Sequence, residues 1–534
     1  MRTVAAYLLL AVALTWPAAL HPVAAVPGGD RTDLHDSLWS LWFVWERLAS
    51  GASPFRVDGL LNIPIGGAFW VADPLNAVLA LPLVAVFGPA AAWTCFVLAH
   101  LTFTGRVAHA LGEAVTPGSG WVTGITVAAS PMLLAQIHNG ASEAVGQGWL
   151  VLALLRLWRL REAATLRNAV AAGVAIGVAG IGHWYGGVDA GIFLVLLLPA
   201  VGRWGLLAAL TAVVVAAPVA LAARSLSTAS DNVVGIKTPR ELSTVRRTIG
   251  AADPVGFLAP GDFRSPDFAR ISRYGERYVH CHYLGWVVLG VAAGGLVRRR
   301  RAPGVWWAAL GLGVVFAAGP VVVRDGAPWI LSGRRGVPLP YFLLERVPPF
   351  DSLSLVYRLA FLSVVSVAVI AGRAVAGWRH RWIVPALALL ELRLLSPARD
   401  LPEHVDARVD PAIVALAGDP DRGAVMNYPI EGGRPYLYEQ TAHGHAVAGT
   451  LNFPNNAASK RVWRALLANA DLPCPALVRA VGGAARREGI GFLVFHRDAA
   501  AADDIYRVPT RRLLETCAAR DLDAPVVVYR FDPG

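Results

Sequence analysis

A short segment near the N-terminus concentrates side chains that can do acid–base chemistry. Residues 28–36 contain three carboxylates and one histidine, namely Asp30, Asp33, Asp36 and His35. A carboxylate held at a membrane surface can act as a general base toward a hydroxyl or amide. It can also hold a divalent metal against a phosphate-linked substrate. A solvated loop without a chemical role is the alternative for any bare acidic cluster. Because this cluster runs directly into the Trp-rich residues 38–45, we favour the functional interpretation.

Charged and aromatic groups elsewhere are candidates for the same site. Glu143 lies at the start of an apolar stretch, so it either offsets the dipole of the following helix or supplies a second active-site carboxylate. Trp184 and Tyr185 lie at the end of another apolar stretch, where such residues usually mark the membrane interface but can also stack on a sugar. The candidates for sugar or acceptor binding are His35, His138, His183, Trp184 and Tyr185.

Arg358 is the candidate for binding a phosphate. It lies about one turn inside an apolar stretch, where a charge is costly and needs a partner. A guanidinium can grip a phosphate through two hydrogen bonds, which makes a lipid phosphate a natural partner. The alternative is that the side chain extends to the outer surface of the membrane.

The chain that positions these groups is strongly apolar. Of its 534 residues, 55% are hydrophobic and 16% charged, whereas about 25% are charged in a typical soluble domain. This composition excludes intrinsic disorder, and recurring apolar stretches of spanning length exclude a single soluble domain. The net charge of +11 reflects arginines in short segments between apolar stretches, as the positive-inside rule expects. We therefore predict membrane lipid, and no nucleic acid, as a partner.

The apolar segments predict a polytopic bundle of about eleven spans. Residues 3–26 form the first span, with a cleaved signal peptide as the alternative. Residues 74–87 are too short to span and should form an interfacial or re-entrant piece ending at Gly88-Pro89. Counting them as a span would place the arginines of 156–167 on the wrong side of the membrane. The remaining spans are predicted near 89–111, 120–136, 144–160, 167–183, 187–202, 204–222, 282–297, 304–323, 353–377 and 381–396.

This orientation places the long polar segments outside the cytoplasm. The transmembrane domain covers 1–396, and residues 397–534 form a soluble extracytoplasmic α/β domain, so the predicted fold class is mainly α. The Trp-rich segment should lie in the membrane interface. The outer segments are 27–73, 223–281, 324–351 and 397–534. In the last of these, strands are predicted at 424–428, 491–495 and 525–529, and helices at 476–488 and 510–519.

Two groups of residues in the C-terminal domain leave alternatives open. Cys474 and Cys517 both lie outside the cytoplasm, where a disulfide is permitted, but the sequence does not give the distance between them. Four aromatic and histidine residues either stack on a sugar or serve as ordinary core and surface residues, and the second interpretation is favoured. These four are Tyr436, Tyr438, His443 and His445.

Four features occur in a fixed order along the chain. They are the acidic loop followed by Leu38-Trp39-Ser40-Leu41-Trp42, the series Ser53-Pro54-Phe55 … Pro64-Ile65-Gly66 … Asp73-Pro74-Leu75-Asn76, the stretch Asn139-Gly140-Ala141-Ser142-Glu143 … Gly148-Trp149-Leu150, and Pro348-Pro349-Phe350 … Tyr357-Arg358-Leu359. Together they resemble bacterial GT-C-type membrane glycosyltransferases with a C-terminal outer domain. The resemblance covers nearly the whole chain.

The resemblance implies an inverting glycosyltransferase of the bacterial inner membrane. Its donor would be a polyprenyl-phosphate-linked sugar, and its acceptor a glycan, lipid or protein outside the cytoplasm. Asp33 matches the family's first-loop base by its spacing to Trp39 and Trp42, with Asp30 and Asp36 as rivals. Glu143 falls on the second-loop acid, and Arg358 on the arginine that meets the lipid phosphate.

Two questions stay open at this point. The crowded Asp/His cluster departs from a clean Asp-x-Asp or Asp-Glu pair, so the base and the need for a divalent cation are undecided. The sequence contains no nucleotide-binding or hydrolase signature such as a Walker motif, GxSxG or HExxH, so a donor must arrive at the outer face. A non-catalytic GT-C-like scaffold and a transporter of lipid-linked glycans are the alternative functions.

Overall fold

The computed structural model divides the chain into two compact units. The described residues are 1–30, 32–71, 73–234, 238–259, 279–297, 302–324, 327–331, 335–396, 400, 402–421, 423–429, 434–449, 456–497, 505–518, 520, 522 and 524–531. The first unit, called the helical unit, contains residues 1–34, 72–222 and 237–406. The second, called the α/β unit, contains residues 35–71, 223–236 and 407–534. Residues 35–71 and 223–236 thus group with residues 407–534.

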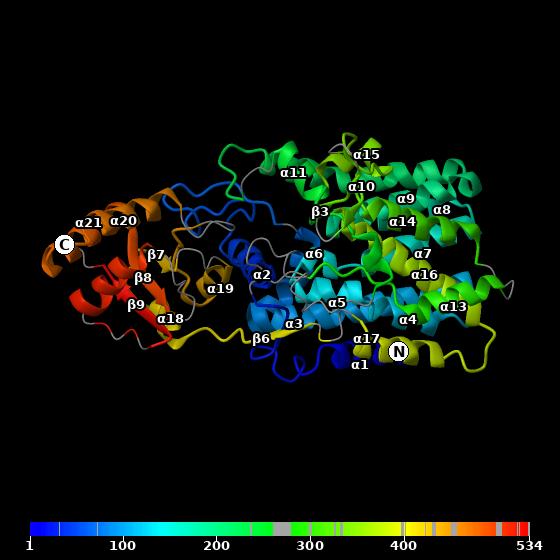
Figure 1. The fold of residues 1–534 in the computed structure, drawn as a ribbon, viewed down its shortest axis with the longest axis horizontal. Helices are drawn as coiled ribbons and strands as arrows, with labels where there is room; N and C mark the ends of the chain where they lie inside the picture. The colour runs from blue at the N-terminus through cyan, green and yellow to red at the C-terminus, as the bar shows by residue number, and fades with distance from the viewer. Residues whose placement is uncertain are drawn as a thin grey trace. The chain divides into compact units, whose positions relative to one another are not determined.

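The helical unit is built from apolar helices (Figure 1). The helix α3 packs against α4 and α7, while α16 packs against α13 and α14. The longer helices are α1 (Arg2–Leu14), α3 (Pro74–Val115), α4 (Gly120–Ala128), α5 (Pro131–His138), α7 (Gly148–Glu162), α8 (Leu166–Gly182), α9 (Trp184–Val201), α10 (Arg203–Ser227), α11 (Pro239–Arg246), α13 (Trp286–Val297), α14 (Gly304–Ala317), α16 (Ala360–Val375) and α17 (Ile383–Leu394). The short helical turns are α6 (Ser142–Val145), η1 (Pro254–Phe257), α15 (Tyr341–Leu344), η2 (Phe350–Ser352) and η3 (Val356–Leu359).

Five helical segments among the described residues are long and apolar enough to cross a membrane. They are Pro74–Val115, Gly120–His138, Trp184–Val201, Arg203–Ser227 and Val356–Val375. Four shorter apolar helices, α1, α8, α13 and α14, accompany them. A mainly helical bundle of apolar segments is therefore confirmed, while the total of about eleven spans stays a prediction.

Glycine and proline mark breaks in the apolar helices, and two of the predicted spans are divided or shortened there. Gly88 has φ 74°, which divides α3 at the predicted Gly88-Pro89 position. Ser130 caps α5 and is followed by Pro131, so the predicted span 120–136 becomes α4 and α5. The predicted span 304–323 ends at Ala317, because Gly319 has φ 77° and Pro320 follows it. Proline lacks the N–H that a continuing helix needs.

Short strand pairs lie in the polar segments of the helical unit. β1 (Val26–Pro27) pairs antiparallel with β6 (His404–Val405). β2 (Val323–Arg324) pairs with β3 (Ala327–Pro328), and β4 (Ile330–Leu331) with β5 (Arg335–Gly336).

The α/β unit contains a three-stranded sheet in the order β7-β8-β9. β7 (Ala424–Tyr428) and β8 (Ile490–His496) are parallel, and β9 (Val526–Arg530) is antiparallel to β8. Each predicted strand is present within one or two residues of its expected bounds. The helices are α2 (Leu34–Ala49), α18 (Pro411–Ala415), η4 (Leu416–Gly418), α19 (Arg434–His443), α20 (Ala457–Ala468), α21 (Cys474–Arg487), α22 (Arg507–Arg511) and the π-helical turn η6 (Arg512–Cys517). A disulfide joins Cys474 to Cys517, which settles the open question about this pair.

The Trp-rich helix α2 belongs to the core of the α/β unit. Trp39 is fully buried, stacks on Phe43 at 4.9 Å between ring centroids, and meets Phe69 edge-on. Its indole N–H donates to Gln440 Oε1 at 2.8 Å. The aromatic face of α2 therefore packs in a protein core, while the location of the helix at the membrane interface stays a prediction.

The aromatic and histidine residues of the C-terminal segment are also buried. Tyr436, Tyr438, His443 and His445 expose 8% or less of their surface. The Tyr436 hydroxyl donates to Pro429 O, and the Tyr438 hydroxyl donates to Ala407 O. They are core residues, as the favoured interpretation predicted, and none is exposed to stack on a sugar.

Candidate functional site

The two polar segments that carry the predicted acids dock on one another. In the turn that follows α5, His138 O accepts the Gly29 N–H at 2.7 Å and Asn139 O accepts the Asp33 N–H at 3.0 Å. Gly140 completes the turn with φ 68°, and a β-carbon there would collide with the backbone of Leu34. The sequence therefore needs glycine at this position, both for the turn and for the close approach.

The Asn139 side chain ties a third segment to this turn. Its Oδ1 accepts the Val279 N–H at 2.7 Å, and its Nδ2 donates to Val279 O at 2.9 Å. Satisfying both backbone groups of one residue fixes the backbone at residue 279 against the turn. The next residue, His280, stacks on Tyr357 with ring centroids 4.3 Å apart. The turn thus brings together groups from segments far apart in the sequence.

Glu143 and Arg358 form a buried ion pair beside this turn. Arg358 Nη1 donates to Glu143 Oε1 at 2.6 Å, and the two side chains are 8% and 19% exposed. Glu143 lies in the first turn of α6 and Arg358 in η3. Burial has the largest single effect and raises the pKa of Glu143, but the charges of Arg358 and His183 and the hydrogen bond from Arg358 together outweigh it, so the pKa lies below its ordinary value. Because the Arg358 side chain is buried, the alternative that it extends to the outer surface is excluded.

Aromatic groups surround the guanidinium. The Arg358 Cζ lies 5.7 Å from the centroid of the Tyr185 ring, within range of a cation–π contact. The Tyr185 hydroxyl accepts the Leu355 N–H at 2.7 Å, which fixes the chain just before η3. Tyr185 and Arg358, two of the predicted site residues, are therefore neighbours.

A second buried carboxylate, Asp73, lies close to Glu143. It caps α3 by accepting the Asn76 N–H at 3.2 Å, and its other oxygen accepts from Asn76 Nδ2 at 2.8 Å. Asn76 Oδ1 in turn accepts the Trp149 indole N–H. Burial raises the pKa of Asp73 to about 7, and the negative charge of Glu143 adds to this effect. The two carboxyls thus have pKa values moved in opposite directions, a pattern that is common where proton transfer takes place.

The three acids of the first polar segment have different surroundings. Asp30 is exposed, Asp33 is half-buried, and Asp36 is buried in the α/β unit. Asp36 Oδ2 pairs with Arg434 Nε at 3.1 Å, which gives it a structural role. The Asp33 backbone is bound to the turn that leads to Glu143.

The remaining predicted residues divide between the two units. His35 lies 6.0 Å from Tyr438 between ring centroids, in the α/β unit. His138 is buried beneath Gly29, Trp184 is half-buried at the start of α9, and His183 is buried beside Tyr185. The structure therefore brings Glu143, Arg358, His183 and Tyr185 into one cluster within the helical unit.

Sequence reasoning missed the roles of Asp73, Gln147 and His280. The signal for Asp73 was present, since Asp-Pro before an apolar helix is a capping pattern. Gln147, whose Nε2 lies 3.3 Å from His183 Nδ1, and His280 carry no local signal, because their importance comes only from the residues that they contact. For metal binding, the described part of the chain contains no group of three or more His, Cys, Asp or Glu side chains able to hold an ion.

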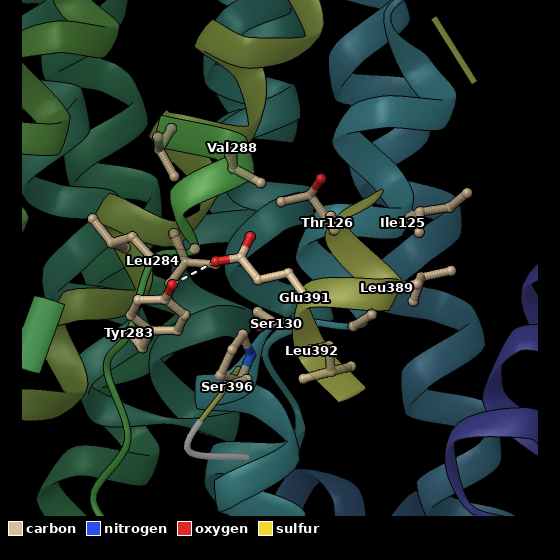
Figure 2. A pocket seen from close by; sticks show the side chains of 16 residues that line it. Ile125, Thr126, Ser130, Tyr283, Leu284, Val288, Leu389, Glu391, Leu392 and Ser396 are labelled. Carbon is tan, nitrogen blue, oxygen red and sulfur yellow. Dashed lines mark hydrogen bonds between the residues drawn. The ribbon is translucent and has the colours of Figure 1, made fainter. Parts of the chain in front are cut away.

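A separate apolar cavity lies between α4, α5, α13, α16 and α17 (Figure 2). The cavity has a volume of about 40 Å³. Glu391 lines it and accepts the Tyr283 hydroxyl together with the N–H groups of Trp286 (2.6 Å) and Val287 (2.9 Å). These bonds cap the N-terminus of α13, so the carboxylate has a structural role there.

Comparison with known structures identifies the type of fold. No protein-family model and no curated protein matches the chain. A cryo-EM structure of the arabinofuranosyltransferase AftD from Mycobacteria is similar, with a TM-score of 0.52 and 15% identity over 93% of this chain and 36% of AftD. The chain has a GT-C-type fold. The resemblance seen in the sequence is thus confirmed at the level of the fold, and the chain spans about a third of AftD.

Structures of the oligosaccharyltransferase from Archaeoglobus fulgidus are also similar. The one tethered to an acceptor peptide with the NVT sequon has a TM-score of 0.49 and 12% identity, covering 93% of this chain and 69% of the oligosaccharyltransferase. The same coverage and identity hold for the complex of AglB with an inhibitory peptide and a dolichol-phosphate, at a TM-score of 0.45.

Proposed function

We propose that the protein is an inverting membrane glycosyltransferase that uses a polyprenyl-phosphate-linked sugar. The buried Glu143–Arg358 pair carries the proposal, because a membrane bundle retains buried charges mainly where they act on a substrate. The GT-C-type fold supports the same class of activity. The acceptor is a hydroxyl or amide group of a glycan, lipid or protein. Transfer takes place at the extracytoplasmic face of a bacterial inner membrane.

Arg358 binds the phosphate of the donor in this proposal. Its Nη1 contacts Glu143, whereas its Nε is buried and has no hydrogen-bond partner among the described residues. A buried N–H without an acceptor costs free energy that a phosphate oxygen would recover. Glu143 keeps the guanidinium compensated until the donor arrives.

Asp33 accepts the proton of the acceptor. The acceptor oxygen or nitrogen forms a bond to the anomeric carbon while the bond from that carbon to the phosphate oxygen breaks. The lipid phosphate leaves with the bonding electrons, and the acceptor proton passes to the Asp33 carboxylate. One displacement inverts the anomeric carbon and needs no nucleophile from the protein. Asp33 is preferred over its rivals because Asp30 is exposed and Asp36 is paired with Arg434.

The test measures release of polyprenyl phosphate, a product that does not depend on which acceptor is used. Purified protein in lipid nanodiscs is incubated with a panel of short-chain polyprenyl-phosphate pentoses and hexoses and a crude envelope extract as acceptor. We expect Asp33→Asn to reduce release at least about 100-fold, and the matched variant Asp30→Asn to remain active. A parallel sample with EDTA tests for a divalent cation.

Three results would contradict parts of the proposal. An active Asp33→Asn variant would remove Asp33 as the base. Tight donor binding without turnover by the wild type, over the whole panel, would favour a non-catalytic scaffold. Movement of intact donor across the bilayer would favour a transporter.

A further inference from the structure

His183 lies in the Glu143–Arg358 cluster without a role in the proposed reaction. It connects α8 to α9 in an extended conformation (φ −159°, ψ 109°). The residue is 5% exposed, and its ring centroid lies 5.2 Å from that of Tyr185. The charges of both Arg358 and Glu143 act on the imidazole. His183 is therefore part of the cluster that holds the guanidinium.

Gln147 fixes which ring nitrogen carries the hydrogen. Gln147 Nε2 lies 3.3 Å from His183 Nδ1, and an amide NH₂ can only donate. Nδ1 must therefore accept, and in the neutral ring the hydrogen is on Nε2. That Nε2 is buried and has no hydrogen-bond partner among the described residues. The contact leaves a single oriented donor facing away from Gln147.

Two buried donors in this cluster thus lack an acceptor. The second is Arg358 Nε, and neither a guanidinium nor this imidazole nitrogen can accept a hydrogen bond. A sugar hydroxyl both donates and accepts, so these two unpaired donors do not select it. A phosphate offers several oxygens that only accept, and charge strengthens each bond.

We propose that His183 is a phosphate-binding residue, which donates its Nε2 hydrogen to the donor phosphate beside Arg358. This inference rests on the proposed function, and it replaces the sugar-binding role that the sequence suggested. As the glycosidic bond breaks, negative charge grows on the departing phosphate. A neutral donor fixed in place strengthens its bond as that charge grows, without reorientation. Gln147 acts through His183 as a positioning residue.

The test compares the affinities of farnesyl phosphate and farnesol, measured on the full-length protein in nanodiscs. The ratio of the two affinities isolates recognition of the phosphate. In His183→Asn, the shorter amide reaches the place of Nδ1 and keeps the contact with Gln147, but no donor remains at the place of Nε2. In His183→Gln, the longer amide places a donor near Nε2. The pair therefore separates loss of the donor from loss of the ring.

We expect His183→Asn to lower the phosphate preference about 10- to 100-fold, as for a lost hydrogen bond to a charged group. His183→Gln should stay within about 3-fold of the wild type. An unchanged preference in His183→Asn would overturn the inference. If that variant does not fold, Gln147→Met serves instead. Without the Gln147 amide, either nitrogen of the His183 ring can carry the hydrogen, so the phosphate preference should fall by a smaller factor. An unchanged preference in Gln147→Met would overturn the inference as well.

Failure of the proposed function is distinguishable from failure of this inference. If the wild type itself shows no preference for farnesyl phosphate, the lipid-phosphate site is wrong. If the wild type shows the preference and Arg358→Gln abolishes it, while His183→Asn retains it, only the role of His183 is wrong.

Discussion

Removing one charge of the Glu143–Arg358 pair should lower the stability of the protein, and the size of the loss should depend on which charge is removed. In Glu143→Gln the buried guanidinium loses its counter-charge and cannot release a proton. In Arg358→Gln the remaining Glu143 carboxyl can take up a proton and become neutral. We therefore expect Glu143→Gln to be the less stable of the two variants. The double variant Glu143→Gln/Arg358→Gln, which has no buried charge at this place, should be more stable than Glu143→Gln.

The size of the effect follows from the geometry. At the observed 2.6 Å and an effective dielectric constant of about 20, the attraction amounts to about 6 kcal/mol. Each ion loses several kcal/mol of hydration on burial, so the intact pair is close to neutral for stability, whereas breaking it costs about 3–5 kcal/mol. Because the Glu143 side chain is still 19% exposed, we expect the lower end of that range. For a chain of this length this corresponds to a fall of roughly 3–4 °C in the thermal midpoint.

The assay is thermal unfolding in nanodiscs followed by size-exclusion chromatography, with the same heating rate for all variants. Glu515→Gln is the matched control, because it breaks the exposed Arg511–Glu515 pair, whose side chains are 49% and 39% exposed. Its midpoint should not change. Equal midpoints for Glu143→Gln and the wild type, or a double variant that is as unstable as the sum of the singles, would refute the reasoning.

Three further perturbations test other parts of the structure. Asp73→Asn keeps an acceptor for the Asn76 N–H but cannot ionise. Since the pKa of Asp73 rises from 3.8 to about 7 on folding, wild-type stability should fall as pH rises from about 4 through 7, and melting curves of the variant should lack this fall. Gly140→Ala should lower the thermal midpoint and the release of polyprenyl phosphate, because φ is 68° and Leu34 fills the space, whereas Gly191→Ala, with nothing within 4 Å, should change neither. Cys474→Ser/Cys517→Ser should lose about 2–4 kcal/mol of stability in the α/β unit, as expected for a disulfide that closes a loop of 43 residues. The loss is measured by proteolysis of that unit with and without reductant. Equal cleavage under the two conditions would contradict the prediction.

Local patterns in the sequence were sufficient for many of the elements. The strands at 424–428 and 490–496 follow from short apolar runs between turn residues. The break at Gly88 follows from a Gly-Pro pair inside an apolar stretch. These features depend on neighbouring residues along the chain, which a single sequence displays in full.

Features that depend on distant partners could not be predicted in the same way. The aromatic stripe of α2 fits a membrane interface and a protein core equally, and the contact that shows its packing in a core, Trp39 with Gln440, joins residues 401 positions apart. Glu143 and Arg358 were each recognised as unusual by type and position. Their contact across 215 positions was not. The same holds for Gln147, which becomes informative only once it is seen beside His183.

The presence of Glu143 beside Arg358 also bears on turnover. A buried guanidinium with no counter-charge would hold a lipid phosphate strongly, both in the donor and in the product that must leave. A carboxylate about 5 Å from the bound phosphate opposes binding by about 3 kcal/mol at an effective dielectric constant of about 20. On the proposed function, Glu143 therefore weakens the grip on the product while keeping the empty site stable. It follows that Glu143→Gln should bind farnesyl phosphate more tightly than the wild type and release polyprenyl phosphate more slowly, a combination that loss of folding alone would not produce.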